Sequence, residues 1–331
     1  MLTRGHFGIR AHMAAWVVTG RSSRYWQHRP TLDFVHGDVP TEVSSSSLEK
    51  STVRRLVLGT AQFESSYGIA RDNSEASVPL EPKLMLAEAS RAGISSLDTA
   101  PGYGSAEQII GDYGWWGEIA TKVDNHTSPR ESLHQSLRRV KRDIVDVVYV
   151  HDYQQLASDS FLSDFVSLRG DGARFLGASV YELDEFEDAM SRDIFDVLQF
   201  PLNVFDRRFL PIAATASARG IRLVARSAML QGLLSRAGLA MAKPSQPLQP
   251  FLQDFEEVCD RFTCEPQVAA VSWVLDQPFI DQIIIGFDSV SQLHQIVQQC
   301  AETSMSTNAV ALLNDLPQPS RDLVDPRTWR W

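Results

Sequence analysis

Cysteine is scarce in this sequence of 331 residues. Only three occur, Cys259, Cys264 and Cys300. An odd set without metal-ligand spacing excludes a disulfide framework and predicts no metal site. Free thiols favour a reducing compartment, so we expect a cytoplasmic protein. A run of about 20 apolar residues, which a membrane-spanning helix needs, is also missing, and we expect no membrane partner.

Positive charge is in deficit. Lysine and arginine number 31 against 41 aspartate and glutamate residues, a net charge of −10. The densest basic run is Arg138, Arg139, Lys141 and Arg142, late in a predicted helix, where cations favour the helix dipole. A solvated helix face is the better interpretation of this run than an anion site. So acidic a chain excludes nucleic acid as an expected partner, and nothing in its composition predicts an oligomeric state.

Acidic residues are absent from the first 32 positions, which carry five arginines. This composition is similar to that of an organellar transit peptide. A disordered extension, or translation from an upstream start codon, is the plainer interpretation. The serine run at 44–47 resembles a linker. We therefore assign residues 1–53 to an N-terminal extension, expected to be disordered, and residues 54–331 to one folded domain.

Eight short segments rich in valine, isoleucine and leucine follow, separated by helical patterns. They mostly lack polar alternation, which is typical of parallel strands buried on both faces. Eight alternating strands and helices predict a closed, right-handed (β/α)8 TIM barrel of the α/β class, with an open doubly wound sheet as the alternative. A GxGxxG fingerprint after the first strand is missing, which disfavours the open sheet. The expected strands are 55–59, 95–97, 118–121, 146–150, 174–178, 197–200, 222–225 and 282–285.

Helix signals punctuate the chain between these strands. Ser128 and Pro129 suit the N-cap and first position of a helix, and Glu131 would complete a capping box. Residues 182–190 and 210–219 read as two further helices. The segment 235–250 follows the seventh strand without a clear pattern, and we expect a long loop that serves as a lid.

Four chemically active side chains fall at or just after the ends of three neighbouring strands: Asp98, Tyr103, Lys122 and His151. The carboxyl ends of barrel strands form the active-site face, so these groups should meet in one mouth. Reducing a carbonyl needs a proton as well as a hydride, and only a cofactor supplies the hydride. A nearby ammonium would lower the pKa of a tyrosine, which is about 10 when free.

In this scheme Lys122 makes Tyr103 a better acid, and Asp98 holds the lysine. His151 orients the substrate oxygen. Each residue alone has an ordinary structural explanation, such as a helix cap or a packed loop aromatic. Their occurrence together favours the catalytic interpretation. Trp115 and Trp116 follow the next helix; packing under a loop is a better interpretation of this pair than a substrate wall.

These residues also carry a resemblance. The run Asp98-Thr99-Ala100-x-x-Tyr103-Gly104-Ser105-x-Glu107, with Thr121-Lys122 and His151, resembles the signature of the aldo-keto reductase superfamily. The resemblance spans residues 54–329 and implies a TIM barrel, a nicotinamide cofactor and Tyr103 as general acid. Further blocks, among them 58–63, 198–208 and 324–329, are similar to bacterial-type members associated with surface-polysaccharide sugar biosynthesis.

The resemblance also implies a cofactor site. Gln199 matches the family's carboxamide ligand of nicotinamide. Arg226 stands where many relatives stack a tyrosine, and a guanidinium can stack on a ring or pair with phosphate. Val180 replaces an asparagine of many relatives. The implied cofactor-binding residues are Thr60, Asp98, Ser179, Gln199, Arg226, Ser227, Gln231, Gly286, Asp288, Ser289 and Gln292.

The choice between NADPH and NADH stays open. NADPH is the default that the resemblance implies, but relatives that prefer it usually place a cation after the eighth strand. Here Gln292 stands at that position and Asp288 is acidic. The expected substrate is a small-molecule aldehyde or ketone, including a sugar or sugar-nucleotide carbonyl. The alternatives are a non-catalytic nicotinamide-binding regulatory subunit, and a lyase with Lys122 as a Schiff base.

Overall fold

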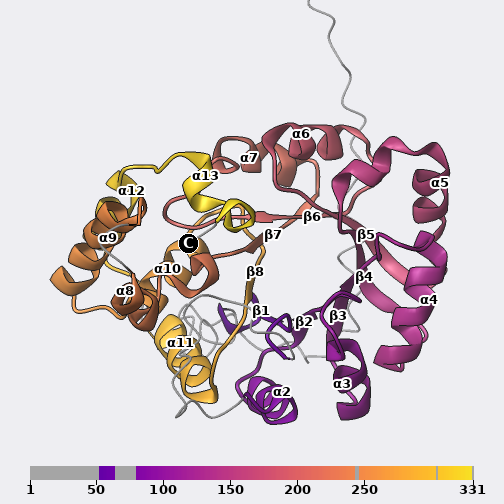
Figure 1. The fold of residues 1–331 in the computed structure, drawn as a ribbon, viewed down its shortest axis with the longest axis horizontal. Helices are drawn as coiled ribbons and strands as arrows, with labels where there is room; N and C mark the ends of the chain where they lie inside the picture. The colour runs from indigo at the N-terminus through magenta and orange to yellow at the C-terminus, as the bar shows by residue number, and fades with distance from the viewer. Residues whose placement is uncertain (1–51, 64–79, 243–245, 303–304, 330–331) are drawn as a thin grey trace, which may run out of the picture. The chain divides into compact units, whose positions relative to one another are not determined.

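The computed structural model describes residues 52–63, 80–242, 246–302 and 305–329. Within them, eight parallel strands close into a barrel in chain order, each paired with the next and the eighth paired with the first. Figure 1 shows helices surrounding this ring of strands. The predicted TIM barrel is therefore confirmed, and the open sheet is excluded. The strands are β1 (Leu56–Gly59), β2 (Ser96–Asp98), β3 (Glu118–Lys122), β4 (Val145–Val150), β5 (Ala173–Ser179), β6 (Val197–Pro201), β7 (Arg222–Arg226) and β8 (Gln282–Ile285).

Helices follow the strands and pack on the outside of the barrel. The described helices are α2 (Pro82–Arg91), α3 (Ala106–Tyr113), α4 (Pro129–Val140), α5 (Asp159–Ser167), α6 (Leu183–Ser191), α7 (Leu210–Ala218), α8 (Arg236–Met241), α9 (Gln249–Arg261), α10 (Pro266–Leu275), α11 (Val290–Glu302), α12 (Thr307–Asp315) and α13 (Arg321–Val324). Short 3-10 turns are η2 (Tyr153–Ala157), η3 (Leu230–Gly232) and η4 (Pro326–Thr328).

The strands are apolar because both of their faces are buried. Residues such as Leu56, Leu176, Leu198 and Ile283 are fully buried in the core between strands and helices. Alternate strand residues instead point inward, and several of them line a small cavity inside the barrel, including Ser96, Glu118 and Arg222. Because all strands are parallel, their carboxyl ends share one rim, and this rim receives the polar residues predicted to be active.

The start of α4 agrees with two of the signals read from the sequence, the N-cap serine and the proline after it. The Ser128 hydroxyl accepts from the Glu131 amide at 3.2 Å, as expected of the N-cap of α4, with Pro129 at its first position. The predicted capping box does not form at α4, because the Glu131 carboxylate instead accepts a bond from the Gln135 side-chain amide at 2.7 Å, on the next turn. The other two predicted helices also form, as α6 and α7.

The segment 235–250 differs from its prediction as a long loop. Ser235 caps α8, its hydroxyl accepting from the Gly238 amide at 3.1 Å, and α9 begins at Gln249. The close approach of Gly238 to the Gly232 carbonyl leaves no room for a side chain, so α8 packs tightly on the preceding turn. The pattern was missed because α8 is too short to show helical periodicity.

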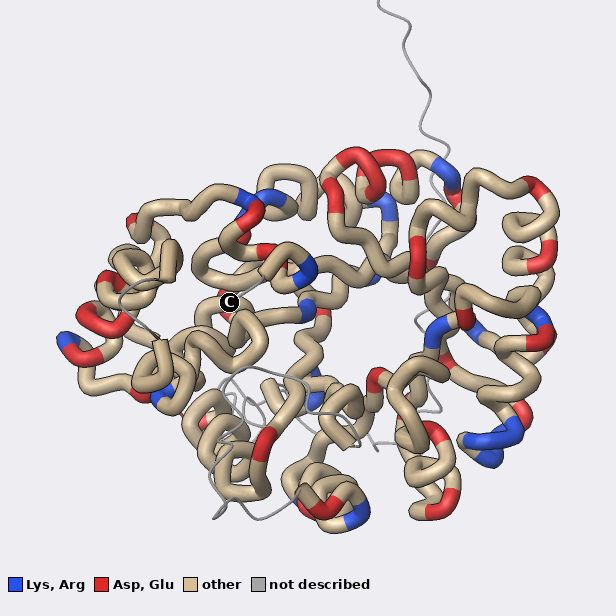
Figure 2. The backbone as a smooth tube through the Cα atoms, in the orientation of Figure 1, with Lys and Arg blue, Asp and Glu red and all other residues tan. Residues whose placement is uncertain are grey.

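The basic run at the end of α4 lies on the outer helical ring, as Figure 2 shows. Lys141 pairs with Asp112 at 2.7 Å, and Arg139 with the buried Glu107 at 2.7 Å. These ion pairs agree with the solvated-face interpretation rather than a shared anion site.

The predicted N-terminal extension lies outside the described residues, apart from its last two. Of these, Val53 is buried in the core, so packing of the barrel begins at least one residue before the expected boundary. None of the helices in the described part of the chain is both long and apolar enough to span a bilayer.

Candidate active site

Asp98, the last residue of β2, is the centre of a buried hydrogen-bond network. Its Oδ1 accepts from Lys122 Nζ at 2.6 Å, and its Oδ2 accepts from Gln199 Nε2 at 2.9 Å. Lys122 also donates to the Thr99 carbonyl at 3.0 Å. All three side chains of this network are nearly inaccessible to solvent. The ends of β2, β3 and β6 are thus joined by one carboxylate.

Asp98 also decides the charge of Lys122. Burial alone would lower the pKa of this ammonium, but the nearby Asp98 carboxylate and the Tyr103 phenol outweigh burial and raise it. A Schiff-base lysine must be deprotonated to attack a carbonyl, and a lowered pKa is what activates it. A raised pKa therefore opposes the lyase alternative.

Tyr103 lies in the loop between β2 and α3, and Lys122 Nζ is 5.0 Å from the centre of its ring. A backbone turn fixes the loop, because the Tyr103 amide donates to the Ala100 carbonyl at 3.1 Å and Gly104 adopts a left-handed φ of 61°. The predicted proximity of phenol and ammonium is therefore present.

The net shift in the pKa of Tyr103 is opposite to the prediction. Burial raises the pKa of Tyr103 more than the Lys122 cation lowers it, and the Asp98 charge also raises it. The expectation that Tyr103 is more acidic than a free tyrosine is wrong for this state of the pocket. Sequence reasoning weighed the cation but not the desolvation of the ring. Tyr103 is accordingly protonated and able to donate at neutral pH.

Glu107 ties the Tyr103 loop to the strand that carries Lys122. Its Oε1 accepts from the Thr121 hydroxyl at 2.6 Å and its Oε2 accepts from Arg139 Nε at 2.7 Å. Glu107 lies on α3, four residues after Tyr103, and is 1% exposed. The buried carboxylate therefore fixes α3 against β3 and helps set the spacing between phenol and ammonium.

His151 follows β4 and is partly buried. Burial first, and then the positive charges of Lys122 and Arg226, lower the pKa of His151 to about 4. Its imidazole is therefore neutral at physiological pH, with one N–H able to donate to a substrate oxygen. A neutral donor orients a carbonyl without competing with Tyr103 as the acid.

A second phenol, Tyr149, lies inside the barrel beneath this network. Burial raises the pKa of Tyr149 to about 12. Gly177 on the neighbouring strand accommodates its ring, because a side chain there would collide with it. Of the four predicted catalytic residues, Asp98 and Tyr103 line the pocket described next, whereas Lys122 and His151 are not among its lining residues. Tyr149 is 2% exposed and lines the cavity inside the barrel instead, so we assign it to the support of the site.

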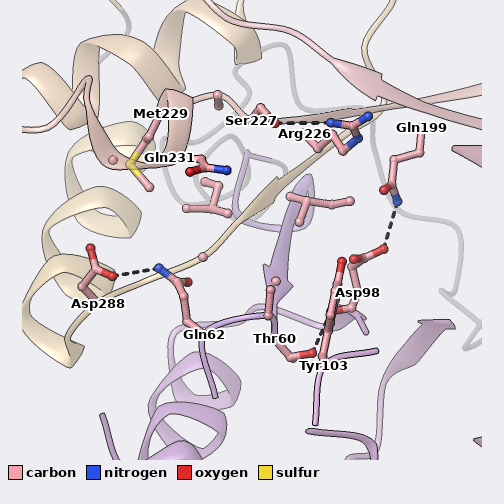
Figure 3. A pocket seen from close by; sticks show the side chains of 17 residues that line it. Thr60, Gln62, Asp98, Tyr103, Gln199, Arg226, Ser227, Met229, Gln231 and Asp288 are labelled. Atoms are coloured by element: carbon pink, nitrogen blue, oxygen red, sulfur yellow. Dashed lines mark hydrogen bonds between the residues drawn. The ribbon is translucent and has the colours of Figure 1, made fainter. Parts of the chain in front are cut away.

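A pocket that is open to solvent, with about 820 Å³ of empty space including its mouth, lies over the network. Figure 3 shows Asp98, Tyr103 and Gln199 on one side of it, and Gln62 and Asp288 on the other. Eight of the residues predicted to bind a cofactor line this pocket: Thr60, Asp98, Gln199, Arg226, Ser227, Gln231, Gly286 and Asp288.

The other predicted cofactor residues lie behind or beside the pocket. Ser179 ends β5 and is buried in register with Gln199. The Ser289 hydroxyl accepts from the Gln292 amide at 3.2 Å, and the Gln292 side chain accepts from the Asp288 amide at 2.8 Å. Ser289 and Gln292 thus shape the turn into α11 and hold the backbone of Asp288.

Gln62 is a lining residue that sequence reasoning did not assign. Its Nε2 donates to Asp288 Oδ1 at 2.8 Å, which connects the loop after β1 to the loop after β8. Gly286 lies against the Gln62 amide so closely that any side chain at that position would collide with it. Only barrel closure brings together residues 226 positions apart, which explains why the sequence pattern did not reveal the pair.

The loop after β7 has a strained backbone where it lines the pocket. Ser227 and Gln231 adopt left-handed φ values of 61° and 54°, which non-glycine residues rarely adopt. Such strain gathers at ligand sites, where the surrounding structure enforces it. The strain, the lining backbone of Gly286 and the buried Gln199 amide are together consistent with a bound dinucleotide.

Arg226 lines the pocket but already has an aromatic partner. Its guanidinium carbon is 3.8 Å from the centre of the Tyr181 ring. The sequence left open whether this guanidinium stacks on a ring or pairs with phosphate; here one of its faces is taken by the Tyr181 side chain.

The tryptophan pair lies away from the pocket. Trp115 is buried, and Trp116 is exposed with its indole N–H donating to the Ser90 hydroxyl at 2.9 Å. Both precede β3 and therefore belong near its amino end. The interpretation as a packing residue fits Trp115, whereas Trp116, which is 61% exposed, is not packed under a loop.

The comparisons with known proteins agree with this geometry. The model of the Aldo/keto reductase family matches residues 55–317. The L-galactose dehydrogenase of Arabidopsis thaliana is 24% identical over 310 residues, which cover 83% of this chain and 93% of that protein. The NADH-specific methylglyoxal reductase of Escherichia coli is 24% identical over 262 residues, covering 63% of this chain and 79% of that protein.

Two solved structures share the fold. An aldo-keto reductase from Bacillus halodurans in its holo form has a TM-score of 0.64 at 20% identity, covering 80% of this chain and 92% of that one. The glycerol dehydrogenase of Gluconobacter oxydans has a TM-score of 0.61 at 22% identity, covering 79% and 90%. The family match spans most of the chain and includes the barrel and its polar rim. The chain therefore belongs to the aldo/keto reductase family and is an NAD(P)H-dependent oxidoreductase.

Proposed function

We propose that this protein reduces an aldehyde or ketone to an alcohol, with Tyr103 as the proton donor. The observation that carries the proposal is the position of the Lys122 ammonium, 2.6 Å from Asp98 and 5.0 Å from the Tyr103 ring, beside an open pocket. A cation at this distance stabilises the phenolate that remains once the proton has been given to the nascent alkoxide.

Each residue then has a distinct part in the reaction. Tyr103, protonated at neutral pH, gives its proton to the substrate oxygen. Lys122 stabilises the resulting phenolate, and Asp98 prevents the lysine from moving away. His151, being neutral, donates a hydrogen bond that orients the carbonyl toward Tyr103. Bound NAD(P)H supplies the hydride.

The lining residues fit a nicotinamide cofactor. The Gln199 carboxamide, fixed by its bond to Asp98, would hold the nicotinamide amide near Tyr103. Thr60, Ser227 and Gln231 would hold the rest of the dinucleotide along the pocket, toward Gly286 and Asp288.

We further propose that NADH is used in preference to NADPH. Asp288 brings a carboxylate to the end of the pocket, held there by Gln62 at 2.8 Å. A carboxylate accepts bonds from ribose hydroxyls, as acidic residues do in other dinucleotide sites, and repels a 2′-phosphate. Arg226 is the one lysine or arginine among the described residues that line the pocket, and Figure 3 places it away from Asp288. One relative is named as NADH-specific.

For the substrate, we propose a small polyhydroxylated carbonyl compound such as a sugar. The named substrates of the relatives are L-galactose, methylglyoxal and glycerol, all small oxygen-rich molecules. The exposed polar groups of the pocket suit such a substrate. A cytoplasmic location would supply both reduced nicotinamide and free sugar metabolites.

The test is a screen of aldehydes and ketones, following the absorbance of NADH and NADPH. Tyr103→Phe should lower turnover by about 10²- to 10⁴-fold, the usual contribution of a general acid, while cofactor binding measured by tryptophan fluorescence persists. Tyr113→Phe, on the far end of α3, is the matched control and should leave turnover unchanged.

Two outcomes would contradict the proposal. Unchanged turnover in Tyr103→Phe would reject this phenol as the acid. Tight cofactor binding without turnover of any carbonyl compound would instead favour the regulatory alternative.

A further inference from the structure

The Tyr181 ring lies between two guanidinium groups. The Arg226 carbon is 3.8 Å from the ring centre and the Arg327 carbon is 3.7 Å from it. Arg226 ends β7, Tyr181 follows β5, and Arg327 belongs to η4 near the C-terminus. Three segments distant in sequence therefore meet at the rim of the barrel, and each cation is attracted by the π-electrons of the same phenol.

The two arginines differ in how their charges are balanced. Arg327 donates to both oxygens of Asp325, at 2.6 Å from Nη2 and 2.9 Å from Nε, and reaches Glu182 at 3.3 Å. Arg327 therefore contacts two carboxylates, both of which also pair with Arg321. The pKa of Asp325 is lowered to about 2, because hydrogen bonds from Arg327 outweigh burial.

Arg226 has no such partner among the described residues. Its Nη2 donates to the Val180 carbonyl at 3.1 Å, and its Nη1 lies 3.5 Å from the Ser227 hydroxyl. Its Nε is buried without a hydrogen-bond acceptor. Asp98 lines the same pocket, but its single negative charge is already paired with the Lys122 ammonium.

The positive charge of Arg226 acts on the pKa values of two predicted catalytic residues. Arg226 adds to the effects of burial and Lys122 that lower the pKa of His151, and it opposes the larger effect of burial that raises the pKa of Tyr103. The arginine also lines the same pocket as Tyr103. In Figure 3 it lies on the side of Gln199, away from Gln62 and Asp288. An anion bound to Arg226 would therefore lie near the reacting carbonyl rather than near the Asp288 end of the pocket.

A partly buried cation without a counter-ion is costly, and stacking on Tyr181 prevents this one from swinging freely into solvent. An oxyanion placed against the guanidinium would restore the missing charge and accept its unused N–H groups. We propose that Arg226, held in place by Tyr181 and Arg327, binds a carboxylate or phosphate group of the substrate. The preferred substrates are then anionic carbonyl compounds, such as oxidised or phosphorylated sugars.

This inference rests on the proposed reductase function and narrows its substrate class. The test compares matched pairs of aldehydes that differ in one anionic group: para-carboxybenzaldehyde with methyl para-formylbenzoate, and glyceraldehyde phosphate with glyceraldehyde. The wild-type protein should have the higher kcat/KM for the anionic member of each pair. In Arg226→Gln the ratio of anionic to neutral kcat/KM should fall by about 10- to 100-fold, the usual effect of losing a hydrogen-bonded charge.

Further variants separate charge from positioning. Arg226→Lys keeps the charge but loses the planar fork, and its ratio should fall less than that of the glutamine variant. Tyr181→Leu frees the guanidinium and should raise KM for the anionic aldehyde more than it changes kcat, whereas Tyr181→Phe should restore the wild-type ratio. Arg174→Gln, an exposed arginine paired with Asp146 at 3.1 Å, is the matched control and should leave the ratio unchanged.

The alternative source of the oxyanion is the cofactor. If Arg226→Gln weakens NADH binding, measured by fluorescence titration, and leaves the ratio unchanged, the partner is a cofactor phosphate and the proposal is overturned. An equal preference of the wild-type protein for both members of each pair would also overturn it.

Failure of the underlying function gives a different result. If neither member of any pair is reduced, the reductase function fails, and calorimetric titration of the NADH-bound protein still tests the anion site. Para-(hydroxymethyl)benzoate should then bind the wild type about 10-fold or more tightly than Arg226→Gln does. Equal binding to the two proteins would reject the site as well.

Discussion

The two ends of the barrel use the same strands to hold polar groups, with different results. β2, β3 and β7 begin with Ser96, Glu118 and Arg222, and they end with Asp98, Lys122 and Arg226. At the amino end the contacts are long: 3.1 Å from the Ser96 hydroxyl to Glu118 and 4.0 Å from Glu118 to Arg222. At the carboxyl end, Asp98 accepts its two bonds at 2.6 and 2.9 Å.

Solvent makes the difference between the two carboxylates. The side chain of Glu118 is 45% exposed, whereas those of Asp98 and Lys122 are 5% and 2% exposed. An exposed ion pair is screened by water and contributes little, while a buried one is strongly oriented and cannot lose one partner without a large cost. Polar residues at strand ends are therefore not enough to make a site; they must also be shielded, saturated with partners and next to an open pocket.

The largest expected effect follows from removing the charge of Asp98, the carboxylate of the buried ion pair. The matched comparison removes the charge of Glu118, the exposed carboxylate at the amino end of the barrel. Asp98→Asn leaves the Lys122 ammonium buried without a counter-ion, and should lower the free energy of unfolding by about 3–5 kcal/mol and abolish turnover. Glu118→Gln should change the free energy of unfolding by no more than about 0.5 kcal/mol and leave turnover intact. Urea unfolding measures the free energy of unfolding of each variant, and oxidation of NADH measures its turnover. Equal destabilisation by the two variants would show that burial does not distinguish the two ends.

Much of this comparison could be predicted from the sequence. Short apolar runs at regular intervals gave all eight strands, since a strand buried on both faces leaves a clear pattern. Because parallel strands end at one rim, the sequence alone predicts that Asp98, Lys122 and His151 lie at the same end of the barrel. Tyr103 follows from a short loop, whose length limits how far its ring can lie from Lys122.

Other features depend on contacts that no local pattern records. Gln62 meets Asp288 only because β1 pairs with β8. Tyr181 lies between Arg226 and Arg327 only because the C-terminal segment reaches the rim of the barrel. The net pKa of Tyr103 depends on how much solvent the folded loop excludes. Closure of the fold, rather than residue type, decides each of these.

An intermediate effect is expected at the opposite end of the pocket, where the charge is negative. Asp288→Asn keeps an oxygen for the Gln62 amide but removes the carboxylate charge that would repel a 2′-phosphate. The ratio of kcat/KM with NADPH to that with NADH should rise about tenfold, corresponding to roughly 1.4 kcal/mol. Asp143→Asn, an exposed acid after α4, is the control and should not change the ratio. A ratio unaffected by Asp288→Asn would show that this carboxylate does not select the cofactor.

The smallest expected effect is that of pH on kcat/KM. A nearly constant kcat/KM would distinguish His151 from a histidine that titrates as it does in water. A base whose pKa is lowered to about 4 takes up its proton only as the pH falls toward that value, and the raised pKa of Tyr103 keeps the phenol protonated well into alkaline solution. The kcat/KM at saturating NADH should therefore vary by less than about twofold between pH values of roughly 5.5 and 8.5.

The control variant His294→Gln removes an exposed imidazole near Glu88 and should give the same pH profile as the wild-type protein. A loss of activity with a midpoint near 6.5, present in both proteins, would mean that the imidazole at the rim is hydrated and titrates as it would in water. The shielding that distinguishes the carboxyl end of the barrel from the amino end would then not extend to His151.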